Sequence, residues 1–488
     1  MYIYWTASKE ENAVTKPTTR AEIKSILASF QRKKAPGESK INKTLMENLP
    51  VQALDFFTET VSETISMGYF PTIYKKALLS FIEKPGKALQ DPFNYRPISL
   101  LELPGKIIEK LICRRLVYHL RSTDNINNNQ YGFTAGRGTQ IALAKLYEII
   151  AMSQAQGQDC NVVSRDIKKA FDKVWHDGLR YKLWHTDPPD IILKLTCSFL
   201  EGRRAAIRLG NYIGPDFQLK SGVPQGSPLS PTLFNLYTAD VPPPGPGCHQ
   251  LIFADDHTQI ITWPTKRSKE GLSIRTVREI EKVNKYEKEW KIATCPEKFQ
   301  LLSISARKPA NVVVNNNAIQ FRRKAKVLGL TFSSSGIKEQ VDTRKAIATN
   351  TLTKIRRFQG VSVELYLHLY KTLVRPQIEY PAIIMTRTSH SNTARLQSIQ
   401  NKALRRALNQ QPPFLNTIEE LHYQLNIEAL NIRLHQLAYS TWQRLEIEDP
   451  DINEESHSLS EMNIRDHVWW RRLEPLVTAD PPLPIYIA

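Results

Sequence analysis

The sequence predicts an α+β protein whose strands gather in the middle of the chain and whose last part is helical. Two observations carry this. Apolar residues recur every three or four positions in some segments, and they alternate or form short runs in others, which are the periods of helices and strands. From about Asp342 the segments become helical and rich in Lys, Arg and Gln.

The first part of the chain combines helices with a single predicted strand. Thr19 and Glu22 form a capping-box pattern, and apolar residues follow them at helical spacing. The further elements predicted here are helices over residues 54–67, 106–120 and 139–153, and a strand over residues 77–82.

The central part carries most of the predicted strands, and we place a domain boundary near Gly336. The apolar residues at Ile274, Val277, Ile280 and Trp290 predict an amphipathic helix. The other predicted elements are strands over residues 161–167, 203–209, 301–306, 312–314 and 327–332, and a helix over 232–240.

Charge and composition indicate a nucleic-acid partner. The chain has 488 residues, with 66 Lys and Arg against 48 Asp and Glu, a formal net charge of +18. This excess is larger than solubility requires and indicates a polyanionic partner. No run of about 18 apolar residues is present, so we expect no transmembrane helix. The five cysteines are widely separated, which argues against a zinc knuckle or a disulfide framework and favours a reducing, intracellular location.

Two adjacent acids, Asp255 and Asp256, lie between apolar runs that read as the strands of a hairpin with the acids at its turn. Asp166 ends another predicted strand. If these strands are neighbours, Asp166 and Asp255 are placed to hold the two metal ions that phosphoryl transfer requires, and Asp256 completes the cluster. The alternative is an ordinary Asp-Asp surface turn.

Further motifs occur in a fixed order around these acids, and together they resemble a known family. They are Arg-Pro-Ile-Ser-Leu-Leu at 96–101, Gln-Tyr-Gly-Phe at 130–133 with Gly-Arg at 136–137, Asp-Ile-Lys-Lys-Ala-Phe-Asp-Lys-Val-Trp-His at 166–176, Gly-Val-Pro-Gln-Gly-Ser-Pro at 222–228, Phe-Ala-Asp-Asp at 253–256 and Leu-Gly-Leu at 328–330. From about residue 33 to residue 406 the chain resembles the reverse transcriptases of non-LTR (LINE-type) retrotransposons, most closely the Jockey-like group.

The resemblance implies a right-hand polymerase fold and an RNA-directed DNA polymerase activity. The expected division is 1–160 for an N-terminal extension and the fingers, 161–336 for the palm with inserted finger segments, 337–450 for a helical thumb and 451–488 for a C-terminal tail. The implied partners are an RNA template, a DNA primer or target DNA, and dNTPs, with no membrane partner. The implied cofactor is a pair of Mg²⁺ ions, with Mn²⁺ as the alternative, and the implied location is the nucleus or cytoplasm.

The resemblance also implies the catalytic residues. Asp166, Asp255 and Asp256 match the metal-binding aspartates, and Ile167 belongs to the same metal-binding segment. Lys298 matches a lysine that is a candidate proton donor to the leaving pyrophosphate, and a plain surface lysine is the alternative.

Nucleotide selection is implied to depend on Phe171, which matches an aromatic steric gate whose ring would clash with a ribose 2′-hydroxyl. The alternative for Phe171 is a core aromatic. Arg96 and Arg137 lie in finger motifs, and the choice between a triphosphate contact, a template contact and a structural role stays open for both. The remaining implied nucleotide-binding residues are Gln225 and Gly226, and the implied primer- or template-binding residues are Gly222, Pro224, Leu328, Gly329, Lys402, Arg405 and Arg406.

Two rival functions remain at this point. An RNA-directed RNA polymerase shares the palm chemistry, but an aromatic at Phe171 argues against it because such an enzyme must admit the 2′-hydroxyl. A catalytically silent nucleic-acid-binding remnant is the second rival, and the presence of Asp166, Asp255 and Asp256 argues against it. The residues that precede Asp166 are matched to the fingers, so we expect no endonuclease domain and expect another agent to make the nick.

Overall fold

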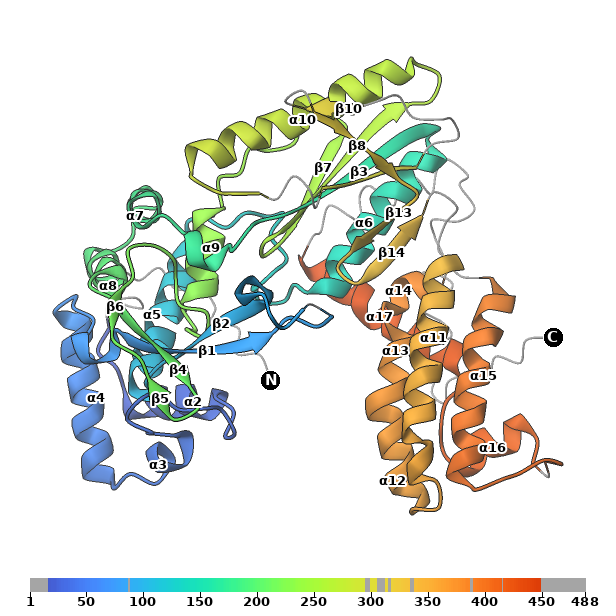
Figure 1. The fold of residues 1–488 in the computed structure, drawn as a ribbon, viewed down its shortest axis with the longest axis horizontal. Coiled ribbons are helices and arrows are strands. Elements are labelled where there is room, and N and C mark those ends of the chain that lie inside the picture. The colour runs from blue at the N-terminus through green and yellow to red at the C-terminus, as the bar shows by residue number, and fades with distance from the viewer. Residues whose placement is uncertain are drawn as a thin grey trace. The chain divides into compact units, whose positions relative to one another are not determined.

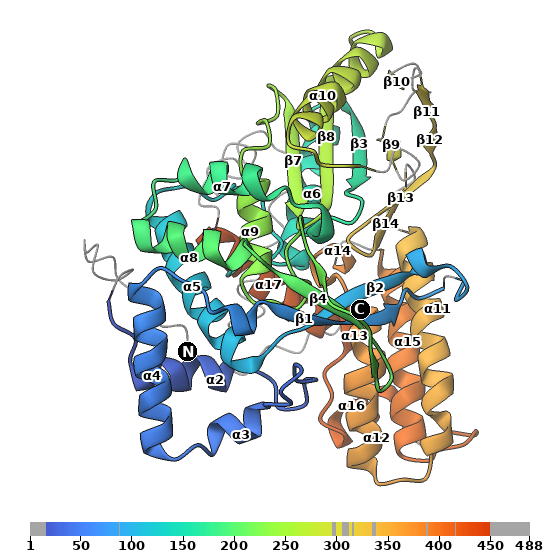
Figure 2. The ribbon, with the colours of Figure 1, turned by 60° about the vertical axis from the view of Figure 1, so that its left-hand side comes forward.

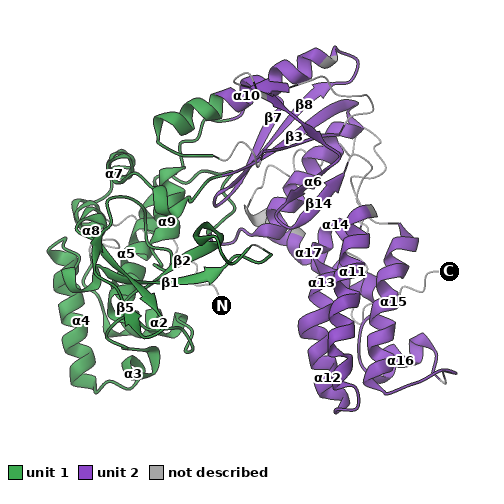
Figure 3. Cartoon of the chain, in the orientation of Figure 1, with its two compact units in different colours: residues 1–133, 167–243, 282–295 green, residues 134–166, 244–281, 296–488 purple. Residues whose placement is uncertain are grey.

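The computed structural model describes residues 16–448, apart from residues 87, 295–298, 305–311, 315–316, 334–337, 387–388 and 415. The chain divides into two compact units, each built from three separate segments (Figure 3). Unit 1 consists of residues 1–133, 167–243 and 282–295, and unit 2 of residues 134–166, 244–281 and 296–488. The division expected from the sequence, into consecutive fingers, palm, thumb and tail, stays a prediction.

Unit 1 contains a small mixed sheet with the strand order β2-β1-β4-β5, in which β6 also pairs with β4 (Figure 1). β1 runs antiparallel to β2 and parallel to β4. Pro97 lies on β2, at the edge of the sheet, where a residue without an N–H is tolerated. The strands are β1 (Lys76–Glu83), β2 (Tyr95–Leu100), β4 (Arg204–Leu209), β5 (Tyr212–Ile213) and β6 (Phe217–Gln218).

The helices of unit 1 bury one continuous apolar core, which includes Ile107, Leu111, Phe199 and Leu233. The Oγ1 of Thr19 accepts a hydrogen bond from the backbone N–H of Glu22, so the predicted cap of the first helix is confirmed. The helices are α2 (Arg20–Ser29), α3 (Lys43–Glu47), α4 (Val51–Ser66), η1 (Thr72–Tyr74), η2 (Pro92–Asn94), α5 (Leu103–Ser122), η3 (Phe171–Lys173), α7 (His176–Trp184), α8 (Asp190–Leu200) and α9 (Ser230–Tyr237).

Unit 2 is organised around a sheet with the strand order β12-β9-β3-β8-β7 (Figure 1). β3 pairs antiparallel with β8 on one side and with β9 on the other. The helix α6 (Thr139–Ala155) packs against β3, β7 and β8. The strands are β3 (Gln158–Asp166), β7 (Cys248–Phe253), β8 (Asp256–Pro264), β9 (Gln300–Ile304) and β12 (Phe321–Arg322).

The predicted amphipathic helix is α10 (Lys269–Glu289), and its first part belongs to unit 2. The side-chain amide of Asn161 in β3 donates to the hydroxyl of Thr276 in α10, at 3.0 Å. Ile280 is fully buried, whereas Ile274 is 64% exposed and does not belong to the apolar stripe. The buried apolar stripe instead includes Leu272, which shares a core cluster with Ile280.

Two hairpins follow the sheet, β10 (Val312–Val314) with β11 (Asn317–Ile319) and β13 (Lys324–Val327) with β14 (Leu330–Ser333). The prediction of one strand over residues 327–332 is wrong. Leu328 and Gly329 both have positive φ, +46° and +80°, and a strand cannot continue through two left-handed residues. The chain reverses there and forms a two-residue turn.

The last part of unit 2 is helical, as predicted, and it buries Tyr366, Tyr370, Leu396 and Leu404. α11, α12 and α15 lie alongside one another (Figure 2), and α14 and α17 pack against α6. The elements are α11 (Lys338–Lys354), η5 (Ile355–Phe358), α12 (Val363–Leu369), a π-helical segment η6 (Tyr370–Val374), α13 (Arg375–Glu379), α14 (Ala382–Met385), α15 (His390–Ala407), α16 (Ile418–Gln424) and α17 (Leu430–Glu448). None of the helices in the described ranges has an apolar stretch long enough to cross a bilayer.

Candidate active site

The two adjacent acids lie where the sequence predicted them, at the turn of a hairpin. Phe253 of β7 pairs with Asp256 of β8, which leaves Ala254 and Asp255 as the two-residue turn. Ala254 has a φ of +56° and is buried. A left-handed conformation costs a residue other than glycine about 1–2 kcal/mol. The tight turn therefore lowers the stability of the fold by about this amount.

Asp166 is the last residue of β3 and lies directly opposite Asp256 of β8. Directly paired residues of antiparallel strands have Cβ atoms about 4.5–5.5 Å apart on one face. Both aspartates line a pocket of about 400 Å³ at this end of the sheet. The other residues that line it are Ser164, Arg165, Gln300, Arg322 and Lys326.

The residues adjacent to the two acids in sequence support the hairpin from the other face of the sheet. Arg165 is 1% exposed, and its Nη2 donates to the Oε1 of Gln259 at 2.8 Å. Burial, together with the neighbouring charge of Arg165, lowers the pKa of His257 to about 3. His257 is therefore neutral at physiological pH, and Arg165 is the cation beneath this part of the sheet.

The donor set of the pocket suits a hard divalent cation. Mg²⁺ prefers oxygen ligands and is usually bound through one or two carboxylates together with substrate phosphates, which fits the pair Asp166 and Asp256. Within the described residues, no group of three or more His, Cys, Asp or Glu side chains is arranged to hold a metal ion, and Asp255 does not line the pocket. Ile167 belongs to unit 1, where its backbone forms a bridge with Thr294. The metal-binding roles of Asp255 and Ile167 stay predictions.

Sequence reasoning did not assign the basic side of this pocket. Arg322 lies on β12 and Lys326 on β13, and both side chains are exposed. The side-chain Oε1 of Gln300 accepts from the backbone N–H of Lys326 at 3.0 Å, which fixes β13 beside β9. The pocket thus combines two carboxylates with three basic residues, the exposed Arg322 and Lys326 and the buried Arg165. The basic run Phe-Arg-Arg-Lys-Ala-Lys at 321–326 is the sequence feature that could have indicated these pocket residues.

In unit 1 the predicted loop at 222–228 is fastened to the segment that carries Phe171. The N–H of Gly222 donates to Val174 O at 2.8 Å, and the N–H of Val223 donates to Phe171 O at 2.7 Å. Gly222 has a φ of +86°, and a Cβ there would lie 2.7 Å from the carbonyl oxygen of Asp172. Only glycine permits this close approach.

The side chain of Gln225 is also held. Its Nε2 donates to the Oδ1 of Asp172 at 2.8 Å. Because a carboxylate only accepts, this bond fixes which end of the amide faces Asp172 and turns the Oε1 away from it. Burial raises the pKa of Asp172, and the hydrogen bond from Gln225 partly offsets this. Gly226 approaches the carbonyl oxygen of Ser99, from which an added Cβ would be 2.5 Å distant.

Below this loop, unit 1 contains a buried pair of opposite charges. Glu109 of α5 is fully buried, and Arg203 is 1% exposed. Burial raises the pKa of Glu109 to about 7, although Arg203, Ser227 and Lys106 act in the opposite direction. Ser227 also caps α9, since its Oγ accepts from the backbone N–H groups of the helix start. The pair therefore lies under the junction of the loop and α9.

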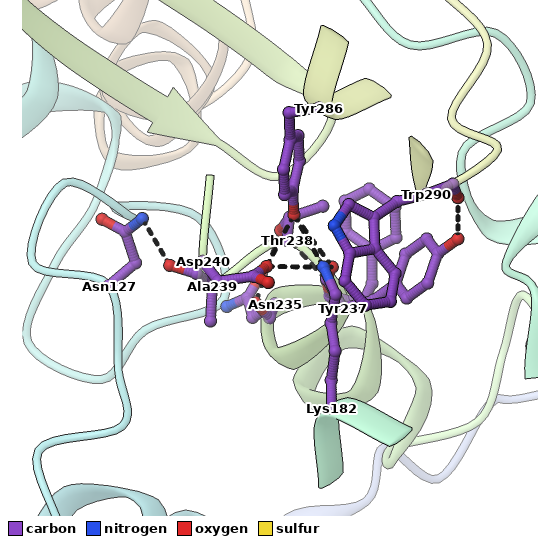
Figure 4. Close-up of polar contacts among 10 residues, drawn as sticks. Asn127, Lys182, Asn235, Tyr237, Thr238, Ala239, Asp240, Tyr286 and Trp290 are labelled. Atoms are coloured by element: carbon purple, nitrogen blue, oxygen red, sulfur yellow. Dashed lines mark hydrogen bonds and ion pairs between the residues drawn. The ribbon is translucent and has the colours of Figure 1, made fainter. Parts of the chain in front are cut away.

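The far end of α9 is anchored by Lys182 of α7 (Figure 4). The Nζ of Lys182 donates to Tyr237 O at 2.6 Å, to Asp240 Oδ1 at 2.5 Å and to the hydroxyl of Tyr286 at 2.8 Å. It also lies 3.8 Å from the ring centroid of Trp290. Burial lowers the pKa of Lys182 to about 8, and the carboxylate of Asp240 opposes this shift. Both ends of α9 are thus held by side chains that lie outside the helix, Ser227 at its start and Lys182 at its end.

The remaining predicted site residues are spread over both units. In unit 1, Arg96 is exposed on β2. In unit 2, Arg137 lies in a turn where its N–H donates to Thr134 O, and Leu328 and Gly329 form the turn between β13 and β14. Pro224 is buried in the unit 1 loop. Lys298 lies outside the described residues.

Of the three predicted basic residues on α15, only Lys402 is exposed. The guanidinium of Arg405 lies 3.7 Å from the ring centroid of Phe414. The Nη1 of Arg406 donates to Leu352 O at 2.9 Å. Both arginines therefore also hold the helices of unit 2 together, and their role in nucleic-acid binding stays a prediction.

Comparison with known proteins identifies the family of the chain. Residues 82–332 match the family described as "Reverse transcriptase (RNA-dependent DNA polymerase)". The chain is 30% identical over 80% of its length to a probable RNA-directed DNA polymerase from transposon X-element of Drosophila melanogaster, covering 44% of that protein. It is 29% identical over 88% of its length to the RNA-directed DNA polymerase from mobile element jockey of the same species, covering 48% of it.

The chain thus spans a little under half the length of these curated relatives. Among solved structures, apo telomerase from Candida tropicalis aligns with 81% of this chain and 68% of its own, at 11% identity and a TM-score of 0.41. The family match covers half of the chain and confirms the resemblance to reverse transcriptases, and the structure confirms a mixture of helices and sheets. The chain therefore belongs to the reverse transcriptase family.

Proposed function

We propose that this chain is an RNA-directed DNA polymerase that extends a DNA primer on an RNA template, as the polymerase of a LINE-type, Jockey-like retrotransposon. The observation that carries the proposal is the cross-strand pair Asp166 and Asp256, which lines one pocket at the end of the unit 2 sheet. Membership in the reverse transcriptase family supports it, as do the activities for which the relatives are named.

In the proposed reaction, Asp166 and Asp256 would hold two Mg²⁺ ions through their carboxylate oxygens, and Asp255 would add a ligand from the turn. When bound, such ions activate the primer 3′-hydroxyl and stabilise charge on the leaving pyrophosphate. Arg322 and Lys326, which line the same pocket, attract the phosphates of the primer strand. Lys298 remains the proposed proton donor to pyrophosphate.

Unit 1 contributes selection of the nucleotide. Phe171 acts as the gate against a ribose 2′-hydroxyl, and Gln225 presents its side-chain oxygen beside Gly226 because Asp172 holds the amide nitrogen. The remaining proposed contacts are to the triphosphate or template by Arg96 and Arg137, to template or primer by Gly222, Pro224, Leu328 and Gly329, and to the duplex backbone by Lys402, Arg405 and Arg406.

The test is primer extension on poly(rA)/oligo(dT) with Mg²⁺, with dTTP and UTP supplied in parallel. We expect extension with dTTP alone, and its loss in a variant that carries Asp255→Ala and Asp256→Ala. The matched control is Asp190→Ala on α8, whose carboxylate is 86% exposed. Extension with UTP as efficient as with dTTP would favour an RNA polymerase. Salt-sensitive duplex binding without extension would favour a catalytically silent binding protein.

A further inference from the structure

Resting on the proposed polymerase function, we propose that Phe133 is a positioning residue for the gate, Phe171. Its ring restrains the Phe171 ring and thereby sets how strictly the enzyme rejects ribonucleotides. Phe133 lies in the motif at 130–133, and sequence reasoning gave it no role.

The Phe171 ring contacts two other rings in unit 1. It stacks on Phe234 of α9, with centroids 5.2 Å apart and an interplanar angle of 21°. Phe133 meets it edge to face, with centroids 6.0 Å apart and an angle of 88°. Both separations lie in the range of favourable aromatic pairs. Phe234 is buried and belongs to the core, so Phe133 is the restraint on the accessible side of the gate.

The backbone of Phe133 is held in a conformation that its side chain disfavours. Its φ is +56°, and a bulky residue in this region is an outlier that persists only where the surroundings impose it. Phe133 is also 58% exposed. Burial of a core aromatic therefore does not account for a strained backbone at this position, whereas placement of the ring against Phe171 does.

The segment that carries Phe133 is held by α9 and by the turn that follows α9. The Nδ2 of Asn235 donates to Gly132 O at 2.9 Å. The Nδ2 of Asn127 donates to Ala239 O at 2.9 Å (Figure 4). The turn that carries Phe133 is thus hydrogen-bonded to α9, and Phe234 is itself a residue of α9. Since Lys182 anchors the end of α9, the two rings that flank Phe171 share one fixed support.

The test compares Phe133→Leu and Phe133→Gly with the parent chain, and measures kcat/KM for dTTP and for UTP on poly(rA)/oligo(dT). The glycine variant removes the ring and also relieves the positive φ, so it keeps the fold. Phe133→Tyr retains the ring, and Phe56→Leu on α4, where Phe56 is 72% exposed, controls for loss of an exposed phenylalanine. Phe171→Ala reports whether Phe171 is the gate at all.

We expect the ratio of kcat/KM for dTTP to kcat/KM for UTP to decrease by a factor of about two to ten in Phe133→Leu and Phe133→Gly. This factor corresponds to the free energy typical of one aromatic pair. Phe133→Tyr and Phe56→Leu keep the parental selectivity. The positioning role is overturned if the Phe133 variants lose kcat/KM equally for both nucleotides. It is also overturned if their ratio of kcat/KM values is unchanged although Phe171→Ala accepts UTP more readily than the parent chain. No relaxation in Phe171→Ala instead removes the gate assignment, and no extension by the parent chain removes the proposed function.

Discussion

Replacement of Gly222 by alanine is expected to destabilise unit 1 through two separate effects. Gly222 has a φ of +86°, and a Cβ built on it lies 2.7 Å from the carbonyl oxygen and 2.9 Å from the Cα of Asp172. The left-handed conformation costs an alanine about 1–2 kcal/mol. Overlap with backbone atoms that cannot rotate away adds about 1–3 kcal/mol. The free energy of unfolding should therefore fall by about 2–5 kcal/mol.

Gly202→Ala is the matched control for this substitution. Gly202 has a φ of +63°, but no atom lies within 4 Å of the position of its Cβ. Only the conformational cost of about 1–2 kcal/mol applies there. Urea unfolding of both variants beside the parent chain isolates the close approach of Gly222 to Asp172.

The same overlap predicts an effect on activity. The added Cβ must move from 2.7 Å to at least the ordinary contact distance of 3.4 Å, which displaces the loop that carries Gln225. A displacement of about 1 Å lowers the rate of a positioned reaction by up to about a hundredfold. We expect Gly222→Ala to lose most of its dTTP extension and Gly202→Ala to keep it. Equal effects of the two substitutions on stability and extension would refute the reasoning.

Two further predictions concern residues around the same loop. The pKa of Glu109 is raised from 4.5 to about 7, so its contribution to stability is complete below about pH 4.5 and is lost as the pH rises through 7. A shift of this size is worth roughly 3 kcal/mol. The stability of Glu109→Gln relative to the parent should therefore rise by that amount between pH 4.5 and 8 in urea unfolding, whereas a constant difference would contradict the burial of an ionisable group. Asp172→Ala releases the amide of Gln225, and one lost hydrogen bond of about 0.5–1.5 kcal/mol should raise the KM for dTTP about two- to tenfold with kcat little changed. A fall in kcat alone would exclude this role.

The acidic hairpin could be predicted because its evidence is local. Apolar runs flank Asp255 and Asp256 on both sides, and this pattern alone places the acids at a turn. The prediction that Asp166 lies near them depended on two strands being neighbours, and the register of β3 on β8 confirms it for Asp256. The ordered motifs in turn predicted the family correctly.

The residues that were missed depend on contacts between distant segments. Arg322 reaches the pocket because β12 pairs parallel with β9, and strand order is not encoded in local periodicity. Glu109 lies in the predicted helix over 106–120 and Arg203 in the predicted strand over 203–209, and neither prediction shows that these two distant charges are buried together. Ile274 fitted the helical spacing but is exposed, whereas Leu272 and Ile280 of the same helix are buried in the core of unit 2. In each case tertiary packing decided the outcome.

The central claim is that Asp166 and Asp256 together form the metal-dependent centre of a DNA polymerase. The most direct measurement is the rate of dTTP extension on poly(rA)/oligo(dT), as Mg²⁺ is titrated, for the parent chain, Asp166→Asn, Asp256→Asn and the control Asp190→Asn. We expect saturable Mg²⁺-dependent extension by the parent and the control. We expect Asp166→Asn and Asp256→Asn each to lose extension while they still bind the primer–template in a salt-dependent manner. Undiminished extension by either variant would contradict the central claim.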